Sequence, residues 1–352
     1  MDSKTKNYIT IGICGVLAAA VAIVLAMSGN PGNMAICIAC FIRDTAGALK
    51  LHTAPVVQYL RPEIVGIILG ALITAVATKE YKASAGSSPF TRFILGMTVM
   101  IGALIFLGCP LRMVLRMTAG DLNAWVALVG FVAGIATGTF FLKKGFSLGR
   151  AQAVKKAEGF VLPIVMLVLF ILSIATTLFA ASTEGPGSMH APVILSIVAG
   201  LVFGAVAQRS RMCFGGSIRD AFLIHDFGGL IVIGILFAGV LIYNLVSGHF
   251  NLAFEAQPIA HTEALWNILG MYVVGFGAVL LGGCPLRQLV LVGNGETDSA
   301  VTFLGFLVGA ACAHNFGLAS SAAGTTEAGR IACIACIVIL FVIAFVNMKR
   351  KA

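Results

Sequence analysis

Charged side chains are rare in this sequence: Asp, Glu, Lys and Arg make up only 11% of its 352 residues. In soluble globular domains about a quarter of the residues are charged. This shortage excludes a cytosolic enzyme, a nucleic-acid-binding protein and a disordered scaffold. Hydrophobic residues instead account for 59% of the chain, and the mean hydropathy is +1.01. The composition indicates a polytopic membrane protein whose residues 1–352 form one integral domain in the lipid bilayer.

The hydrophobic residues fall into ten apolar segments separated by short polar connections. A helix needs about 20 apolar residues to cross the bilayer, and most of these segments approach that length. Their hydrophobicity is even along the segment, whereas the strands of a membrane barrel alternate over about ten residues. The sequence therefore predicts an all-α bundle with spans at 8–27, 63–78, 93–108, 123–142, 160–181, 191–207, 228–247, 265–283, 299–318 and 328–347.

Lys and Arg are absent from the connections 182–190, 248–264 and 319–327. Among the connections that carry no other signal, these three share one side of a ten-span chain, and the other side carries Lys4, Lys6, Lys79, Lys82, Arg92, Lys143, Lys144, Arg150, Lys155, Lys156, Lys349, Arg350 and Lys351. Cytoplasmic connections are enriched in Lys and Arg, so we expect both termini in the cytoplasm of a bacterial inner membrane. The same asymmetry accounts for the net charge of +9 without an anionic ligand.

The two halves of the chain repeat with an offset of 175 or 176 residues. The motif Cys-x5-Arg-Asp begins at Cys37 and again at Cys213, and Gly-Cys-Pro-Leu-Arg begins at Gly108 and again at Gly283. Equivalent spans lie an odd number of crossings apart, so we expect inverted repeats that form an hourglass with re-entrant, broken helices. The predicted divisions are repeat 1 at 8–142, a linking span at 160–181, repeat 2 at 191–318 and a C-terminal span at 328–347.

Each Gly-Cys-Pro step predicts a helix break. Proline prefers the first position of a helix, so Pro110 and Pro285 put Cys109 and Cys284 at helix N-termini. Free backbone N–H groups and the helix dipole favour an anion there. A single Gly-Cys-Pro is adequately explained as a turn with cysteine as a small apolar filler. Two symmetric copies, starting at Gly108 and Gly283 and each followed by arginine, indicate a function.

Symmetric arginines and carboxylates accompany these motifs. The arginines lie beside or inside apolar segments: Arg43, Arg112, Arg219 and Arg287. Each costs roughly 2.5–3.5 kcal/mol near the bilayer centre unless it is compensated. The carboxylates in matching positions are Asp44, Asp121, Asp220 and Glu296. Several desolvated guanidinium groups would hold a permeant anion too tightly, so we expect these residues to brace the cysteine loops and to raise the local potential.

The symmetric cysteines are the expected contact groups for a substrate. A thiol is a weak, polarizable donor that contacts a sulfur or selenium atom without trapping it. These substrate-path residues are Cys37, Cys109, Cys213 and Cys284. The cysteines without a matching cysteine are assigned to packing: Cys14, Cys40, Cys312, Cys333 and Cys336. Arg116 is answered by Leu291, so it either makes one funnel more basic or is an exposed residue.

The Cys-x5-Arg-Asp and doubled Gly-Cys-Pro-Leu-Arg motifs resemble the YeeE/YedE family of bacterial inner-membrane proteins, which includes thiosulfate-uptake proteins. The resemblance covers nearly the whole chain. The stretches 282–293, 298–300 and 314–317 are most similar to the YedE subgroup, associated with selenium metabolism. The resemblance implies a relay of S–H to sulfur hydrogen bonds, carried over by motif onto the four symmetric cysteines. It also implies a small TusA-like sulfur-carrier partner on the cytoplasmic side, and the sequence contains no such domain.

The substrate implied is a thiosulfate-like ion, a selenium analogue or another reduced sulfur species, and nothing in the residues separates sulfur from selenium. The alternative function is a membrane thiol oxidoreductase or a sulfur or selenium transferase. That function needs a resolving cysteine or a cofactor site, and no haem or flavin signature is present. A soft-metal transporter is disfavoured, because arginine beside single cysteines repels a cation. We therefore expect a transporter and not an enzyme, with no metal or cofactor.

The asymmetry of basic residues predicts the topology. Tags at both termini should report the cytoplasm, and cysteines introduced into the connections 182–190 and 248–264 should react with an impermeant maleimide added outside the cell. A periplasmic C-terminus would contradict the ten-span count and remove the basis for inverted repeats.

Overall fold

The computed structural model describes residues 3–348, and its regular secondary structure is almost entirely helical. Within those residues nine helical stretches are long and apolar enough to cross a membrane. The chain is therefore an all-α polytopic membrane protein. All ten expected segments are helical, although α3 is shorter than a typical span and α7 ends at Ala175. They are α1 (Ser3–Met27), α3 (Pro62–Ala77), α4 (Pro89–Phe106), α6 (Leu122–Lys143), α7 (Lys156–Ala175), α9 (Val193–Arg209), α11 (Gly228–Val246), α12 (Ala264–Leu281), α14 (Thr297–Asn315) and α15 (Glu327–Val346).

Apart from the four-residue α8 (Gly185–Ser188), four short helices interrupt this series: α2 (Ile38–Ala48), α5 (Pro110–Thr118), α10 (Phe214–Ile224) and α13 (Pro285–Gly293). Each has 9 or 11 residues. At 1.5 Å per residue such a helix reaches about halfway across the hydrocarbon core. In all four the residue before the first helical turn is one of the symmetric cysteines. The breaks expected at Gly-Cys-Pro are therefore present, and the Cys-x5-Arg-Asp motifs mark two more.

The same order of long and short helices occurs twice. In each half a long helix is followed by a short one, two long ones, a second short one and two further long ones. The segment expected as a linking span, α7, thus holds the same place in the first series as the C-terminal α15 in the second. Each series contains five long helices, so an element of one half and its counterpart run in opposite directions if every long helix crosses the membrane.

The two halves are interlocked rather than side by side. Helix α6 packs on α12 and α4 packs on α14, and in the same way α3 packs on α9 and α1 on α11. Glycines allow the close approach of these helices. A Cβ at Gly130 of α6 would lie 2.0 Å from the Ile268 carbonyl oxygen, and one at its counterpart Gly305 would lie 2.3 Å from the Phe93 carbonyl oxygen. The core is thus built at contacts between the halves.

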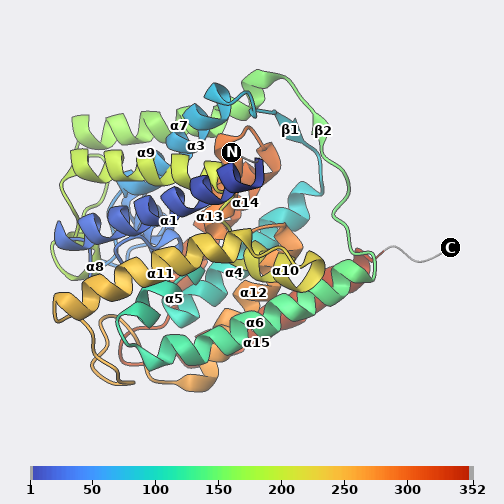
Figure 1. Cartoon of the computed structure of the whole chain (residues 1–352). Helices are drawn as coiled ribbons and strands as arrows, with labels where there is room; N and C mark the ends of the chain where they lie inside the picture. Colours follow the sequence, from blue (N-terminus) through green and yellow to red (C-terminus); the bar gives the residue numbers. More distant parts are fainter. Residues whose placement is uncertain (1–2, 349–352) are drawn as a thin grey trace.

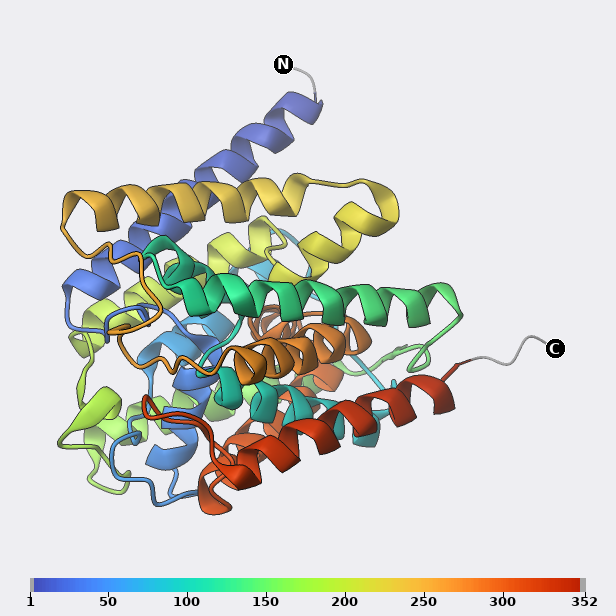
Figure 2. The same ribbon diagram turned by 90° about the horizontal axis from the view of Figure 1, so that it is seen from below.

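The connections gather at two ends of the bundle (Figure 1). At the first, the sheet end, β1 (Ser84–Ala85) pairs with β2 (Gln152–Ala153), and Phe146 bridges to Met348. The opposite end carries the short helix α8 (Gly185–Ser188). Figure 2 shows the described end of α15, in red, at the same side as in Figure 1.

Lys82 lies at the sheet end, where its amide donates to the Asn294 carbonyl, whereas Arg61 donates to the carbonyls of Pro186 and Met189 at the α8 end. Lys349, Arg350 and Lys351, which the sequence argument also counts, lie outside the described residues. Which end faces the cytoplasm stays a prediction.

Substitution of Gly130 by alanine tests the interlocking. The new Cβ would overlap the backbone of α12, and overpacking of this kind typically costs about 1–3 kcal/mol. We expect Gly130→Ala to lower the thermal midpoint of the detergent-solubilised protein, measured by fluorescence-detected size-exclusion chromatography. Gly234→Ala is the matched control, since a Cβ there meets no atom within 4 Å. Equal midpoints for the two variants would show that the close approach contributes nothing to stability.

Candidate functional site

Two of the symmetric cysteines meet in the first half. Cys37 is the N-cap of α2 and Cys109 is the N-cap of α5. Their Sγ atoms are 3.9 Å apart, and the Cys37 Sγ also accepts the Cys40 amide at 3.4 Å. Both residues are buried. We call Cys37 and Cys109 the first cysteine pair: two thiols between the facing N-termini of two short helices.

The second half repeats this arrangement. Cys213 is the N-cap of α10 and Cys284 is the N-cap of α13. The Cys213 Sγ accepts the Gly216 amide at 3.2 Å and the Cys284 amide at 3.4 Å. We call Cys213 and Cys284 the second cysteine pair. All four cysteines expected on the substrate path therefore lie at helix N-termini, two by two, where the backbone is electropositive.

The residues expected to break the helices lie at the breaks. Pro110 and Pro285 occupy the first turns of α5 and α13, where their missing N–H groups cost no hydrogen bond. A Cβ at Gly108 would lie 2.9 Å from the Arg112 side chain, and one at Gly283 would lie 2.7 Å from Arg287. Glycine thus leaves room for an arginine to fold back over each break.

Cys40 joins the first pair, although the sequence assigned it to packing. It lies three residues after Cys37 in the first turn of α2, so the two thiols share a helix face. Its Sγ is 4.0 Å from the Leu107 carbonyl oxygen, and Arg112 Nη1 donates to it at 3.6 Å. The Cys-x-x-C spacing was the available signal. The counterpart in the second half is Gly216, so the second pair has no third thiol.

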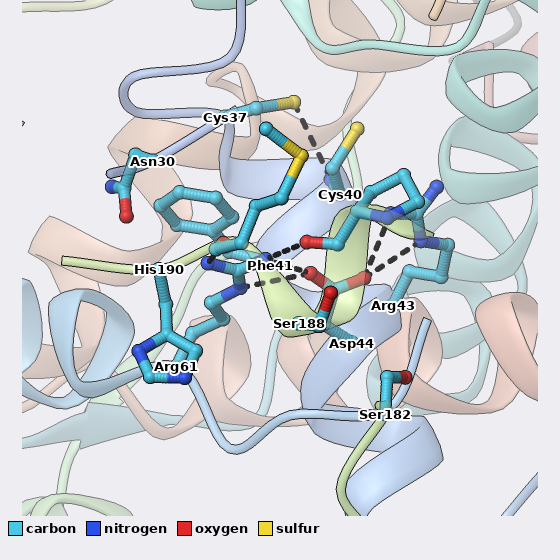
Figure 3. Close-up of polar contacts among 12 residues, drawn as sticks. Asn30, Cys37, Cys40, Phe41, Arg43, Asp44, Arg61, Ser182, Ser188 and His190 are labelled. Atoms are coloured by element: carbon cyan, nitrogen blue, oxygen red, sulfur yellow. Dashed lines mark hydrogen bonds and ion pairs between the residues drawn. The ribbon is translucent and has the colours of Figure 1, made fainter. Parts of the chain in front are cut away.

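Asp44 binds two arginines (Figure 3). Its Oδ1 accepts from Arg43 at 2.7 Å and its Oδ2 accepts from Arg61 at 2.8 Å. Arg61 also donates to the carbonyls of Pro186 and Met189, and its guanidinium lies 4.5 Å from the centre of the Phe41 ring. The expected brace at Arg43 and Asp44 is present. Arg61 was missed, because its contact with Asp44 depends on the packing of α3 and α8 against α2.

Arg112 and Asp121 do not bind each other. Arg116 Nε donates to Asp121 Oδ2 at 2.6 Å, and its Nη1 donates to the Phe106 carbonyl at 3.0 Å. Arg116 is fully buried, which corrects the alternative of an exposed residue. Arg112 instead donates to backbone carbonyls, including those of Leu107, Asn33 and Ile259. It braces the break, but through carbonyl oxygens and not through a carboxylate.

The arginines of the second half differ again. Arg219 binds Asp220 at 2.8 Å, and both side chains are partly exposed. Arg287 makes no ion pair or hydrogen bond within residues 3–348, and its Nη1 is buried without a partner. Glu296, expected beside it, accepts a long bond from Ser299 at 3.5 Å. Arg287 and Glu296 form no ion pair within the described residues, so the bracing role expected of these two residues stays a prediction.

Two buried loop histidines lie near the first pair. His52 Nε2 is 3.0 Å from the Arg43 carbonyl oxygen and His261 Nε2 is 2.8 Å from that of Ile105. Burial lowers the pKa of both imidazoles, against the opposing effect of the carbonyl bonds. Both are therefore neutral at pH 7 and add no charge around the thiols.

A cavity of about 860 Å³ opens beside the second pair. Cys213, Arg219 and Arg287 line it, and it extends to Glu80 and Arg209, whose side chains are exposed at the sheet end. Cys37 and Cys109 are 0% and 1% exposed, whereas Cys213 is 7% exposed. Cys284 is 1% exposed, like Cys109, and does not line the cavity. In this conformation Cys213 of the second pair is therefore reached from the sheet end, and the first pair is closed.

The family model described as sulphur transport matches residues 209–346, which contain the second cysteine pair. The thiosulfate transporter TsuA of Spirochaeta thermophila is 30% identical over 115 residues, covering 32% of this chain and 34% of the relative. TsuA of Escherichia coli is 28% identical over 124 residues, 34% of each chain. The chain thus spans about a third of the length of these curated relatives. Together with the paired cysteine motifs, these matches support the resemblance to the YeeE/YedE family, and the match to the family model covers residues 209–346 alone.

Proposed function

We propose that the chain is a bacterial inner-membrane transporter that takes up a small sulfur-containing anion along its two cysteine pairs. The observation that carries this proposal is the pairing itself. Two thiols lie between facing helix N-termini in each half of the chain. Broken helices that present N-termini inside a membrane protein are a known way to build a substrate site.

The chemistry of the cysteine pairs suits an anion that passes through the protein rather than one that stays tightly bound. A thiol forms weak hydrogen bonds and is polarizable, so it contacts the soft end of a sulfur anion without holding it. The helix N-termini offset the negative charge of the ion. In the first half Arg43, Arg61, Arg112 and Arg116 are occupied by carboxylates and carbonyls, so their charges do not trap an anion.

The proposed path joins two funnels that belong to inverted repeats. The first repeat covers 8–142 and the second 191–318, and the matching places of α7 and α15 favour adding one of these helices to each. In the predicted topology the first pair belongs to the periplasmic funnel and the second pair to the cytoplasmic funnel. The cavity at the second pair then opens to the cytoplasm, where a TusA-like sulfur carrier would receive the ion.

The substrate proposed first is thiosulfate, because both curated relatives bear the name of thiosulfate transporters. A selenium analogue is the second candidate, since a thiol contacts selenium in the same way. Transport along the thiols uses no bound cofactor or metal and no catalytic residue.

A membrane thiol oxidoreductase or a sulfur or selenium transferase is the alternative. The 3.9 Å between the Sγ atoms of Cys37 and Cys109 favours it, because neighbouring thiols exchange disulfides and persulfides readily. An enzyme of this kind carries a covalent adduct on one cysteine during turnover, whereas a transporter does not.

Substitution of single thiols tests the proposed path. Cys109→Ser and Cys284→Ser should each lower the uptake of ³⁵S-thiosulfate into proteoliposomes by about tenfold or more, because a hydroxyl is a harder donor to a soft atom. Cys312→Ser is the control, since Cys312 lies on α14 outside both pairs. Normal uptake by both variants would exclude the thiol path. A persulfide or mixed disulfide found by intact-protein mass spectrometry in every turnover condition would favour the enzyme.

The ion pairs should differ in their effect on folding. Asp44→Asn leaves two buried guanidinium groups without their carboxylate, and breaking a buried pair typically costs about 3–5 kcal/mol. We expect strongly reduced abundance in membranes, measured by immunoblot. Asp220→Asn is the matched control, because its pair with Arg219 is partly exposed and should tolerate the change. Normal abundance of Asp44→Asn with selective loss of thiosulfate binding would instead assign the cluster to the substrate site.

A further inference from the structure

Arg287 and its counterpart Arg112 hold the same sequence position and have different surroundings. Arg112 is fully buried, and it donates to the carbonyls of Asn33 at 3.2 Å and Ile259 at 3.1 Å as well as to that of Leu107. Arg287 is partly exposed and has no such bond within the described residues. The repeat therefore predicts a brace at Arg287 that the structure does not contain.

Two other residues brace the second break in its place. Gln288 Nε2 donates to the carbonyls of Leu281 at 3.3 Å and Gly283 at 3.4 Å. Arg92 Nη1 donates to the same Leu281 carbonyl at 3.3 Å. The position that answers Gln288 in the first half is Met113, whose thioether has no proton to donate. Gln288 and Arg92 thus brace the carbonyls on either side of Gly282, the counterpart of Leu107. Arg287 makes none of the carbonyl bonds of Arg112 within the described residues.

Arg287 lines the 860 Å³ cavity together with Cys213. Other arginines of that cavity are already paired, Arg219 with Asp220 at 2.8 Å and Arg209 with Glu80 at 3.9 Å. Arg211 is exposed to solvent. Arg287 differs from these three, since its Nη1 is buried and has no hydrogen-bond partner. A buried donor of this kind needs an acceptor, and the cavity is where one can enter.

Gly216 lines the same cavity and, having no side chain, leaves the Cys213 thiol uncrowded. Its counterpart Cys40 contacts Arg112 and covers the first pair. A Cβ at Gly216 would lie 3.0 Å from the Cys213 Sγ, so a larger residue would crowd the thiol. The second half thus offers both a soft group and a strong oxyanion donor to one cavity.

We infer that Arg287 and Cys213 form a two-part site for an anion with an oxyanion group at one end and an exposed chalcogen at the other. The planar guanidinium matches oxyanion oxygens in a bidentate geometry, and the thiol contacts the chalcogen. The site rests on the proposed function, because it places the ion at the inner end of that path. It makes Arg287 a specificity residue: ions that carry only one of the two groups, such as hydrosulfide or sulfate, engage half of the site.

The test measures thiosulfate binding to the full-length protein. Arg287→Gln should weaken ³⁵S-thiosulfate binding by about tenfold, measured by scintillation proximity in nanodiscs. Arg287→Lys keeps the positive charge but loses the planar, bidentate guanidinium, so it should bind thiosulfate with intermediate affinity. Arg209→Gln is the matched control: it removes the same charge from the same cavity at an exposed pair, and should change thiosulfate binding less than about threefold.

A measurement on the unaltered protein keeps the test independent of folding in the variants. Thiosulfate should raise the thermal midpoint of the wild type more than sulfate does at equal ionic strength, because only thiosulfate fills both parts of the site.

Equal stabilisation by thiosulfate and sulfate would overturn the two-part site, as would equal effects of Arg287→Gln and Arg209→Gln. If the wild type takes up thiosulfate and Arg287→Gln binds it with unchanged affinity, this site is refuted and the proposed function stands. Arg287-dependent binding without any uptake by the wild type supports the site and refutes the transporter.

Discussion

Backbone groups inside a membrane must find hydrogen-bond partners within the protein, and this constraint governs how the chain breaks its helices. Four helices start within the protein, and each new start leaves several N–H groups without an intrahelical partner. Cysteine at the N-cap meets part of that demand, as the sulfur atoms of Cys37 and Cys213 show by accepting amides from the turn they precede. The remaining electropositive N-termini face each other in pairs. Thiols and positive helix ends are therefore joined in one place by the same structural need.

The carbonyl groups at the preceding helix ends impose the complementary demand. In the first half Arg112 and Arg116 donate to the carbonyls of Leu107 and Phe106. Arginine suits this task because its five N–H groups serve several acceptors at once. The charge it brings is offset in one case by Asp121 and in the other by a cage of carbonyl oxygens. The guanidinium groups of Arg112 and Arg116 are thus bonded to groups of the protein itself.

The two halves share a plan and differ in how tightly they are closed. Three thiols and several bonded arginines fill the first half, where Cys40 and Arg112 cover the pair. The second half replaces Cys40 with Gly216 and Met113 with Gln288, and a cavity with a free arginine results. These two differences accompany the different closure of the two halves. In the described conformation the first cysteine pair is closed, and Cys213 of the second pair is accessible from the cavity.

The sequence alone determined the membrane class, the ten apolar helices, the duplicated motifs and the breaks at Gly-Cys-Pro, because each depends on local composition or on residues adjacent in the chain. It also placed Cys109 and Cys284 at helix N-termini, since proline acts on the residues next to it, whereas the N-cap positions of Cys37 and Cys213 came from the structure. Only the tertiary structure decided which groups meet. Arg61 binds Asp44, Arg116 binds Asp121, Cys40 joins the first pair and Arg287 stays unbound, because such contacts depend on how helices distant in sequence face one another. A repeat in sequence predicts equivalent backbones, but the partners of a side chain come from neighbours that the repeat does not preserve.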